Sequence, residues 1–69
     1  MEQELRKNLA RNLKVERVKK DLTQEKLAEM AGISAKHLTK IENKNVTPII
    51  YIVYKLAKAL DVTVDTFIY

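Results

Sequence analysis

The sequence contains no cysteine and no tryptophan, and it has only one histidine, one glycine and one proline among its 69 residues. Without cysteine the chain forms no disulfide and no thiolate metal site, and a single histidine cannot build a zinc cluster. One glycine is too few for a phosphate-binding glycine-rich loop. Ser34, the only serine, lies three residues before His37, with no acid or oxyanion donor apparent beside the pair. We therefore expect no metal, no other cofactor and no enzymatic activity.

Long apolar stretches are also missing. No segment approaches the roughly 18 consecutive apolar residues that a membrane span needs, and the charged N-terminus lacks the apolar run of a signal peptide. These absences lead us to expect a cytoplasmic protein with no membrane association, and no small-molecule ligand is evident. The formal net charge of +4 weakly favours a polyanionic partner such as nucleic acid.

The scarcity of chain-breaking residues favours helices joined by tight turns. Leu5, Leu9 and Leu13 recur four residues apart, which is the spacing of one apolar helix face. Residues 49–54 are β-branched and aromatic and so favour a strand by propensity, but this run continues unbroken to Leu60 and has no second strand to pair with. The sequence therefore predicts one all-α domain over residues 1–69. Its five helices are expected at about 2–20, 23–31, 34–43, 48–60 and 63–68.

The strongest local pattern lies between residues 23 and 43. Thr23 has the chemistry of a helix N-cap, Gly32 stands where a left-handed residue ends a helix, and Ser34 can cap the next one. Two short helices joined by a three-residue turn that holds a glycine form the signature of a helix-turn-helix.

The second helix of this pair has two different faces when it is projected at about 100° per residue. Leu38 and Ile41 lie on the inner face, whereas Lys36, Thr39 and Lys40 lie on the outer face. Amines and hydroxyls suit the acceptors of guanine in a DNA major groove, and a first-turn alanine suits a thymine methyl group. The predicted base-reading residues are Ala35, Lys36, Thr39 and Lys40. The alternative is that these side chains are ordinary solvent-facing residues.

Phosphate contacts are expected from groups that flank the outer face. Amides at a helix N-terminus attract anions, which favours the start of the first helix of the pair. The predicted phosphate-binding residues are Thr23, Gln24, His37, Asn43 and Lys44. For His37, which falls at the edge of the inner face, a half-buried packing role is equally consistent with the pattern.

Several segments carry a family resemblance: 22–28 (LTQEKLA), 31–34 (AGIS), 41–43 (IEN) and 56–62 (LAKALDV). Together they resemble the lambda-repressor-like (Cro/C1, or XRE) helix-turn-helix family over about residues 9 to 68. The resemblance implies a compact five-helix domain that binds operator DNA, usually as a dimer, and most often represses transcription. It also implies a structural ion pair between Arg17 and Glu42.

The chain departs from the family pattern at two turns. Asp21 replaces the usual glycine before the helix-turn-helix, and Lys44 replaces the usual glycine after it, so we expect the left-handed residue of that loop at Asn45. Further on, Thr47 is expected to cap a helix that begins at Pro48, because proline there loses no hydrogen bond. Thr63 is expected to cap the last helix in the same way.

The apolar arc of the helix at 48–60 is about twice the roughly 100° that packing on one core requires. Ile50 and Val53 can serve the core, which leaves other apolar side chains without a partner. Such surfaces usually mark an interface. The predicted homodimer interface consists of Ile49, Ile52, Phe67, Ile68 and Tyr69. The alternative is a monomer that tolerates scattered apolar residues on its surface.

These patterns predict a sequence-specific DNA-binding transcriptional regulator. We expect a repressor that binds a palindromic operator in double-stranded DNA as a homodimer, with its two reading helices about 34 Å apart. The alternative function is a protein-interaction module, or an antitoxin-type partner protein, with secondary DNA binding. That alternative predicts weak binding to any DNA with a steep salt dependence.

Overall fold

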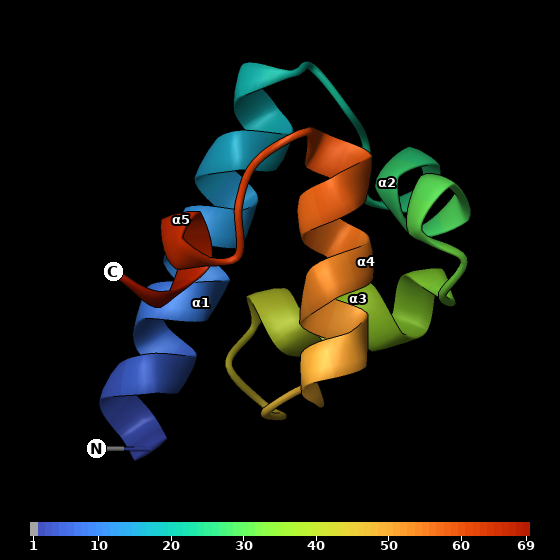
Figure 1. Ribbon diagram of the computed structural model, residues 1–69. Helices are drawn as coiled ribbons and strands as arrows, with labels where there is room; N and C mark the ends of the chain where they lie inside the picture. The colour runs from blue at the N-terminus through green and yellow to red at the C-terminus, as the bar shows by residue number, and fades with distance from the viewer. Residues whose placement is uncertain (1) are drawn as a thin grey trace.

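The computed structural model describes residues 2–69 and contains five α-helices and, within that range, no strand. The helices are α1 (Glu2–Lys19), α2 (Gln24–Ala31), α3 (Ala35–Glu42), α4 (Ile50–Leu60) and α5 (Asp65–Ile68), as Figure 1 shows. The predicted all-α, five-helix class is confirmed. None of these helices is long and apolar enough to cross a membrane.

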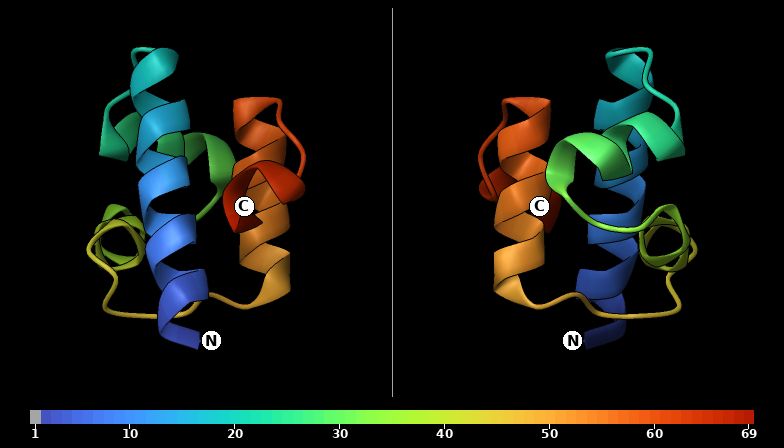
Figure 2. Two further views of the ribbon diagram at one scale, coloured as in Figure 1. Left: turned by 90° about the vertical axis from the view of Figure 1, so that its left-hand side faces the viewer. Right: turned by 90° about the vertical axis from the view of Figure 1, so that its right-hand side faces the viewer.

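The core lies where α1, α2, α3 and α4 meet and is closed from the side by α5. Its fully buried side chains are Leu13, Leu27, Leu38, Ile41, Leu56, Leu60 and Phe67. Each such side chain contributes about 1.5–3 kcal/mol relative to an exposed one. Helix α1 packs on α3 and α5, and α2 packs on α3 and α4. Figure 2 shows that this arrangement places α3 and α4 on opposite sides of the domain.

Side-chain and backbone caps fix the geometry of α2, the turn and α3. The Thr23 hydroxyl accepts a hydrogen bond from the Lys26 amide over 3.0 Å, and the Ser34 hydroxyl accepts one from the His37 amide over 3.0 Å. Gly32 ends α2 with a φ of 73°, in the left-handed region that favours glycine. The two caps and the glycine therefore stand where the local pattern placed them.

The starts of α4 and α5 differ from the prediction. Helix α4 begins at Ile50, after an extended Ile49 that makes no side-chain cap, so the expectation of a start at Thr47 and Pro48 is wrong. The Thr47 hydroxyl instead accepts a hydrogen bond from Arg6 Nε over 2.8 Å, which ties the loop to α1. Helix α5 begins at Asp65, after Val64 and without a side-chain cap, so the expectation that Thr63 caps this helix is also wrong.

Among residues 2–69, three residues other than glycine adopt a left-handed backbone: Asp21 (φ 58°), Lys44 (φ 65°) and Asp61 (φ 57°). The expectation that Asn45 takes this conformation is therefore wrong. The Asn45 amide bonds instead to the Lys40 carbonyl over 2.9 Å, and the chain reverses one residue earlier, at Lys44. Lys44 thus occupies the position of the family's glycine without a glycine's freedom.

Two asparagines of α1 hold the C-terminal segment against the domain. Asn8 Nδ2 donates to the Ile68 carbonyl over 3.2 Å, and Asn12 Nδ2 donates to the Phe67 carbonyl over 3.1 Å. The Phe67 side chain is 0% exposed. Phe67 is therefore a core residue, and its assignment to a dimer interface is wrong.

The apolar side chains at the start of α4 are also distributed differently from the prediction. Ile52 is partly buried and packs against the core, so it is not the free interface residue that the helical projection indicated. Ile50, which was expected to serve the core, is 69% exposed. The physical reason is that Ile50 lies in the first turn of α4, at the edge of the core. There it lines an open hollow of about 230 Å³ together with Leu5, Val64 and Ile68.

Candidate nucleic-acid interface

Helix α3 presents one face to the core and the other to solvent. Leu38 and Ile41 are buried, which anchors the helix. Lys36 and Lys40 are exposed on the opposite face, while Ala35 and Thr39 are half-buried between the two faces. Two amines are therefore available on the outer face of a firmly held helix.

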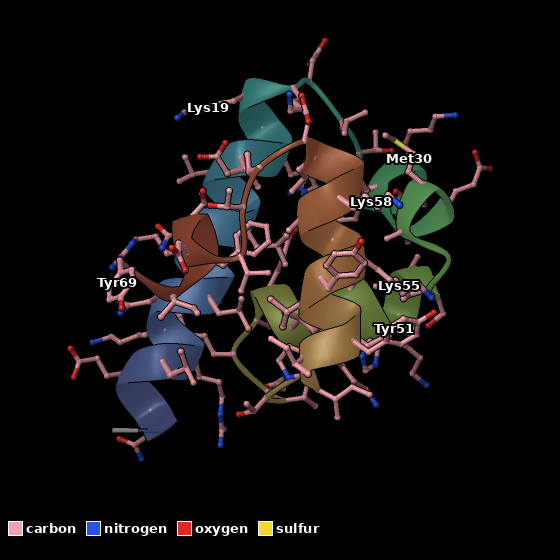
Figure 3. The ribbon with its side chains drawn as sticks, viewed as in Figure 1. Lys19, Met30, Tyr51, Lys55, Lys58 and Tyr69 are labelled. Carbon is pink, nitrogen blue, oxygen red and sulfur yellow. The ribbon has the colours of Figure 1, made fainter. Side chains whose placement is uncertain are left out.

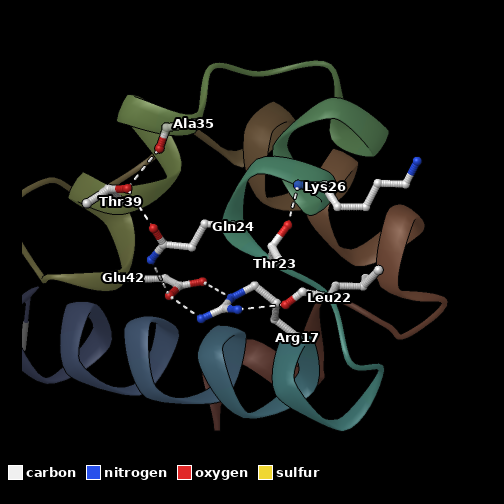
Figure 4. Close-up of polar contacts among 8 residues, drawn as sticks. All are labelled: Arg17, Leu22, Thr23, Gln24, Lys26, Ala35, Thr39 and Glu42. Atoms are coloured by element: carbon white, nitrogen blue, oxygen red, sulfur yellow. Dashed lines mark hydrogen bonds and ion pairs between the residues drawn. The ribbon is translucent and has the colours of Figure 1, made fainter.

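The one acidic residue of α3 is hidden and neutralised. Arg17 Nε donates to Glu42 Oε2 over 2.8 Å, Arg17 Nη2 donates to Glu42 Oε1 over 3.2 Å, and the Glu42 side chain is only 3% exposed. Arg17 Nη1 also donates to the Leu22 carbonyl over 2.7 Å, as Figure 4 shows. Arg17 and Glu42 thus form the ion pair that the family resemblance implies. Its consequence for the site is that the outer face of α3 offers no anion to repel a phosphate.

Gln24 connects this ion pair to the middle of α3 (Figure 4). Its Nε2 donates to Glu42 Oε1 over 2.9 Å, and its Oε1 accepts a hydrogen bond from the Thr39 hydroxyl over 2.9 Å. A side-chain amide carries two donor hydrogens, so Gln24 retains one N–H that is not used within the protein. The predicted phosphate-binding glutamine is therefore held in one orientation with one donor left over.

The Thr39 hydroxyl is already engaged in two directions. It lies 2.9 Å from Gln24 Oε1 and 2.9 Å from the Ala35 carbonyl. A hydroxyl has a single hydrogen, which these two acceptors share. Thr39 therefore differs from the outward-pointing donor that the sequence indicated: towards a ligand it can offer an acceptor lone pair and a methyl group.

Three of the other residues expected to contact phosphate are neighbours in sequence of Gln24 and Glu42, and the fourth, His37, lies apart from them. Thr23 is exposed at the N-terminus of α2, where the first amides of a helix have no partner within the helix. Asn43 and Lys44 are exposed directly after α3. His37 is half-buried and lines a shallow hollow of about 470 Å³ with Ile33, Pro48 and Ile52, among others. This environment favours a packing role for His37 over a phosphate contact.

The hydrogen bonds around Gln24 were not predictable from the sequence. Through Glu42 and Arg17 they join α1, the start of α2, and the middle and the end of α3, and no spacing rule within one helix identifies such partners. Of the other expected interface residues, Ile49 and Tyr69 are exposed and Ile68 is half-buried, and their side chains take no part in this network. Among residues 2–69 no cluster of three or more potential metal ligands occurs.

A buried ion pair, a capped helix-turn-helix and an exposed basic helix face together define a DNA-binding helix-turn-helix domain. The helix-turn-helix family model HTH_3 matches residues 13–67. The chain belongs to this family, the Cro/C1-type XRE helix-turn-helix proteins, as its resemblance indicated. It is accordingly a DNA-binding transcriptional regulator and not an enzyme.

Solved structures of related proteins share the fold. The chain superposes over its full length on 79% of a hypothetical transcription factor, NHTF, from Neisseria, with 32% identity and a TM-score of 0.93. It also matches an HTH_3 family transcriptional regulator from Vibrio cholerae with 25% identity and a TM-score of 0.92, where 97% of this chain covers 38% of that chain. No curated protein sequence matches this chain.

Proposed function

We propose that this regulator is a repressor that binds a palindromic operator as a homodimer. The observation that carries the proposal is the outer face of α3, where Lys36 and Lys40 are exposed while the only acid of the helix is buried against Arg17. A face of this kind fits the major groove, whose guanines offer the O6 and N7 acceptors.

The chemistry of α3 also indicates which bases the half-site contains. Lys36 and Lys40 are each suited to a guanine, because a lysine ammonium donates to guanine O6 and N7. Ala35 and the methyl group of Thr39 are suited to thymine C5-methyl groups. We therefore expect guanines at two positions of the half-site and a thymine beside them.

Phosphate contacts on both sides of α3 would set its register in the groove. The spare N–H of Gln24 is directed by its bonds to Glu42 and Thr39, so it can donate to a phosphate without losing either bond. Thr23 and the first amides of α2 supply neighbouring donors, and Asn43 and Lys44 supply donors at the other end of α3.

The homodimer is supported by an uncovered apolar surface at the first turn of α4 and the C-terminus. Ile49, Ile50 and Tyr69 are all more than half exposed, and Ile50 and Ile68 line the hollow of about 230 Å³. Contact between two such surfaces around a two-fold axis would stabilise a small domain and pair two reading helices. Repression would then follow from occupation of the operator, which excludes other proteins from that DNA.

The test is the selection of bound sequences from a pool of random DNA by the intact chain. The proposal predicts an enriched palindrome whose half-sites are one helical turn, about 10 base pairs, apart. A single unpaired motif would contradict the dimer. Enrichment of no motif, together with a steep salt dependence on all DNA, would instead support the protein-interaction or antitoxin-type alternative.

A further inference from the structure

Helix α4 carries an aromatic face that remains more than half exposed within residues 2–69. Tyr51 is 61% exposed and Tyr54, three residues further along the same helix, is 51% exposed. The opposite face of α4 is buried through Val53, Leu56, Ala57 and Leu60. The tyrosines are therefore not needed to hold α4 in the domain.

Two lysines cover the rings of these tyrosines. Lys55 Nζ lies 5.0 Å from the centre of the Tyr51 ring, and Lys58 Nζ lies 6.0 Å from the centre of the Tyr54 ring. Figure 3 shows Tyr51, Lys55 and Lys58 projecting from one side of α4, with Met30 of the adjacent helix α2 exposed near them. No acidic residue occurs in α4, so neither ammonium group has a carboxylate partner on its own helix. Lys55 Nζ is half-engaged, because it donates to the Gly32 carbonyl over 3.4 Å, whereas Lys58 is exposed.

We propose that this face, made by Tyr51, Tyr54, Lys55 and Lys58, is a docking surface for an acidic segment of another protein. Tyrosine rings supply a large, rigid apolar contact with a polar edge, and tyrosine is enriched in protein interfaces. Lysines at the rim of such a contact attract carboxylates and speed association. The complementary occupant is a helix or strand that presents leucine-like side chains flanked by aspartate or glutamate.

Charge argues against a second copy of this chain as the occupant. In a two-fold contact the same patch of each copy meets itself, which would bring four ammonium groups, Lys55 and Lys58 of both copies, into one interface to which α4 contributes no acidic residue. An acidic partner meets no such repulsion.

The location of this face leaves it free when the regulator is on DNA. Figure 2 shows α4 on the opposite side of the domain from α3, the helix that presents Lys36 and Lys40. A partner docked on α4 would therefore contact the regulator without displacing it from its site. The inference does not depend on the repressor or palindrome proposals, because its four residues belong to α4 and none of them lies on the outer face of α3.

The test uses a synthetic amphipathic peptide of about 18 residues, long enough to form a helix, with leucines on one face and glutamates beside them. Its binding to the intact chain is followed by fluorescence anisotropy of a dye on the peptide and by amide chemical shifts of the protein. We expect shifts confined to α4 and the end of α2, and no binding of a matched peptide with lysine in place of every glutamate.

Substitutions on the protein test whether the peptide binds to the proposed face of α4. Lys58→Glu and Tyr54→Ala are each expected to weaken peptide binding by about tenfold or more, consistent with loss of a rim charge and of an aromatic anchor. Lys14→Glu makes the same change in net charge on α1, beside the exposed Val15 and Val18, and is expected to leave binding within about twofold of the parent. Thermal unfolding checks that each variant remains folded.

Four results would overturn the inference. Three concern the peptide: equal binding of the lysine peptide, a larger loss with Lys14→Glu than with Lys58→Glu, and chemical shifts that map to α1 or α3. A parent protein whose self-association is abolished by Tyr54→Ala would also contradict it, because the face would then be occupied by a second copy.

Discussion

The Thr39 hydroxyl lies 2.9 Å from Gln24 Oε1 and donates to it, which links the middle of α3 to the first residue of α2. Because Gln24 also donates to Glu42, and Glu42 is paired with Arg17, the two helices of the helix-turn-helix and α1 form one connected polar network. Polar networks of this kind hold their members in a single arrangement when every group is satisfied. No buried side-chain nitrogen or oxygen atom in the described part of the chain lacks a partner.

The first prediction concerns the hydroxyl of Thr39. Thr39→Val keeps the shape of the side chain and removes the donor to Gln24, so the free energy of unfolding should fall by about 1 kcal/mol. DNA affinity should fall several-fold because Gln24 loses its fixed orientation. Urea denaturation and a binding titration measure the two effects. Thr63→Val, at an exposed position, is the control and should change stability by less than about 0.5 kcal/mol.

The ion pair gives the second prediction. Arg17→Met leaves the buried Glu42 carboxylate without its counter-charge and should cost about 3–5 kcal/mol, enough to unfold much of a domain of this size. The double variant Arg17→Met/Glu42→Met removes both charges and should recover most of that loss. Circular dichroism during urea unfolding distinguishes recovery from the opposite outcome, in which the costs of the two substitutions add.

Much of the fold follows from local chemistry that is visible in the sequence. Thr23, Gly32 and Ser34 act within one turn of their own positions, so their roles as caps do not depend on the rest of the domain. Leu9, Leu13 and the inner residues of α3 follow the helical repeat. These features suffice to predict the helix-turn-helix and the exposure of Lys36 and Lys40.

The parts that could not be predicted depend on contacts between elements. The loop before α4 is held by Arg6, which lies 41 positions earlier in the chain, and this bond occupies the Thr47 side chain that was expected to cap the helix. Phe67 belongs to a helix of four residues, which is too short for its periodicity to show which face is buried. The bond between Gln24 and Thr39 exists only because α2 and α3 cross at a particular angle.

Lys44 provides the third prediction, because its backbone and its charge have separate effects. A left-handed residue with a side chain is strained by about 1–2 kcal/mol, whereas glycine is not. Glycine also gives the unfolded chain more conformational entropy, which offsets part of this gain. Lys44→Gly should therefore stabilise the domain by about 0.5–1 kcal/mol. The same change should weaken binding to all DNA sequences and reduce the salt slope by about 1. Lys44→Asn, which tolerates this backbone, should weaken DNA binding without destabilising the fold. Denaturation curves and binding titrations at several salt concentrations measure both effects.

The dimer surface gives the fourth prediction. Ile50→Asp and Tyr69→Asp place a charge on the uncovered apolar surface and should each weaken dimerisation by about tenfold or more, with a parallel loss of operator affinity. Val15→Asp, on the exposed side of α1, should leave both unchanged. Sedimentation over a range of concentrations measures the association. A parent protein that is monomeric at high micromolar concentration would rule out this dimer.

The most direct test of the central claim, that the outer face of α3 reads base pairs, compares the selected operator with a scrambled duplex at several salt concentrations. The parent, Lys36→Ala, Lys40→Ala and a Lys14→Ala control are titrated on both DNAs. We predict that Lys36→Ala and Lys40→Ala each reduce the preference for the operator by about thirtyfold or more, because each substitution removes a base contact worth about 1–3 kcal/mol from both half-sites of the homodimer's operator, while Lys14→Ala preserves it. Equal losses on the operator and the scrambled duplex for all three variants would show that these lysines supply only charge, and would contradict the account.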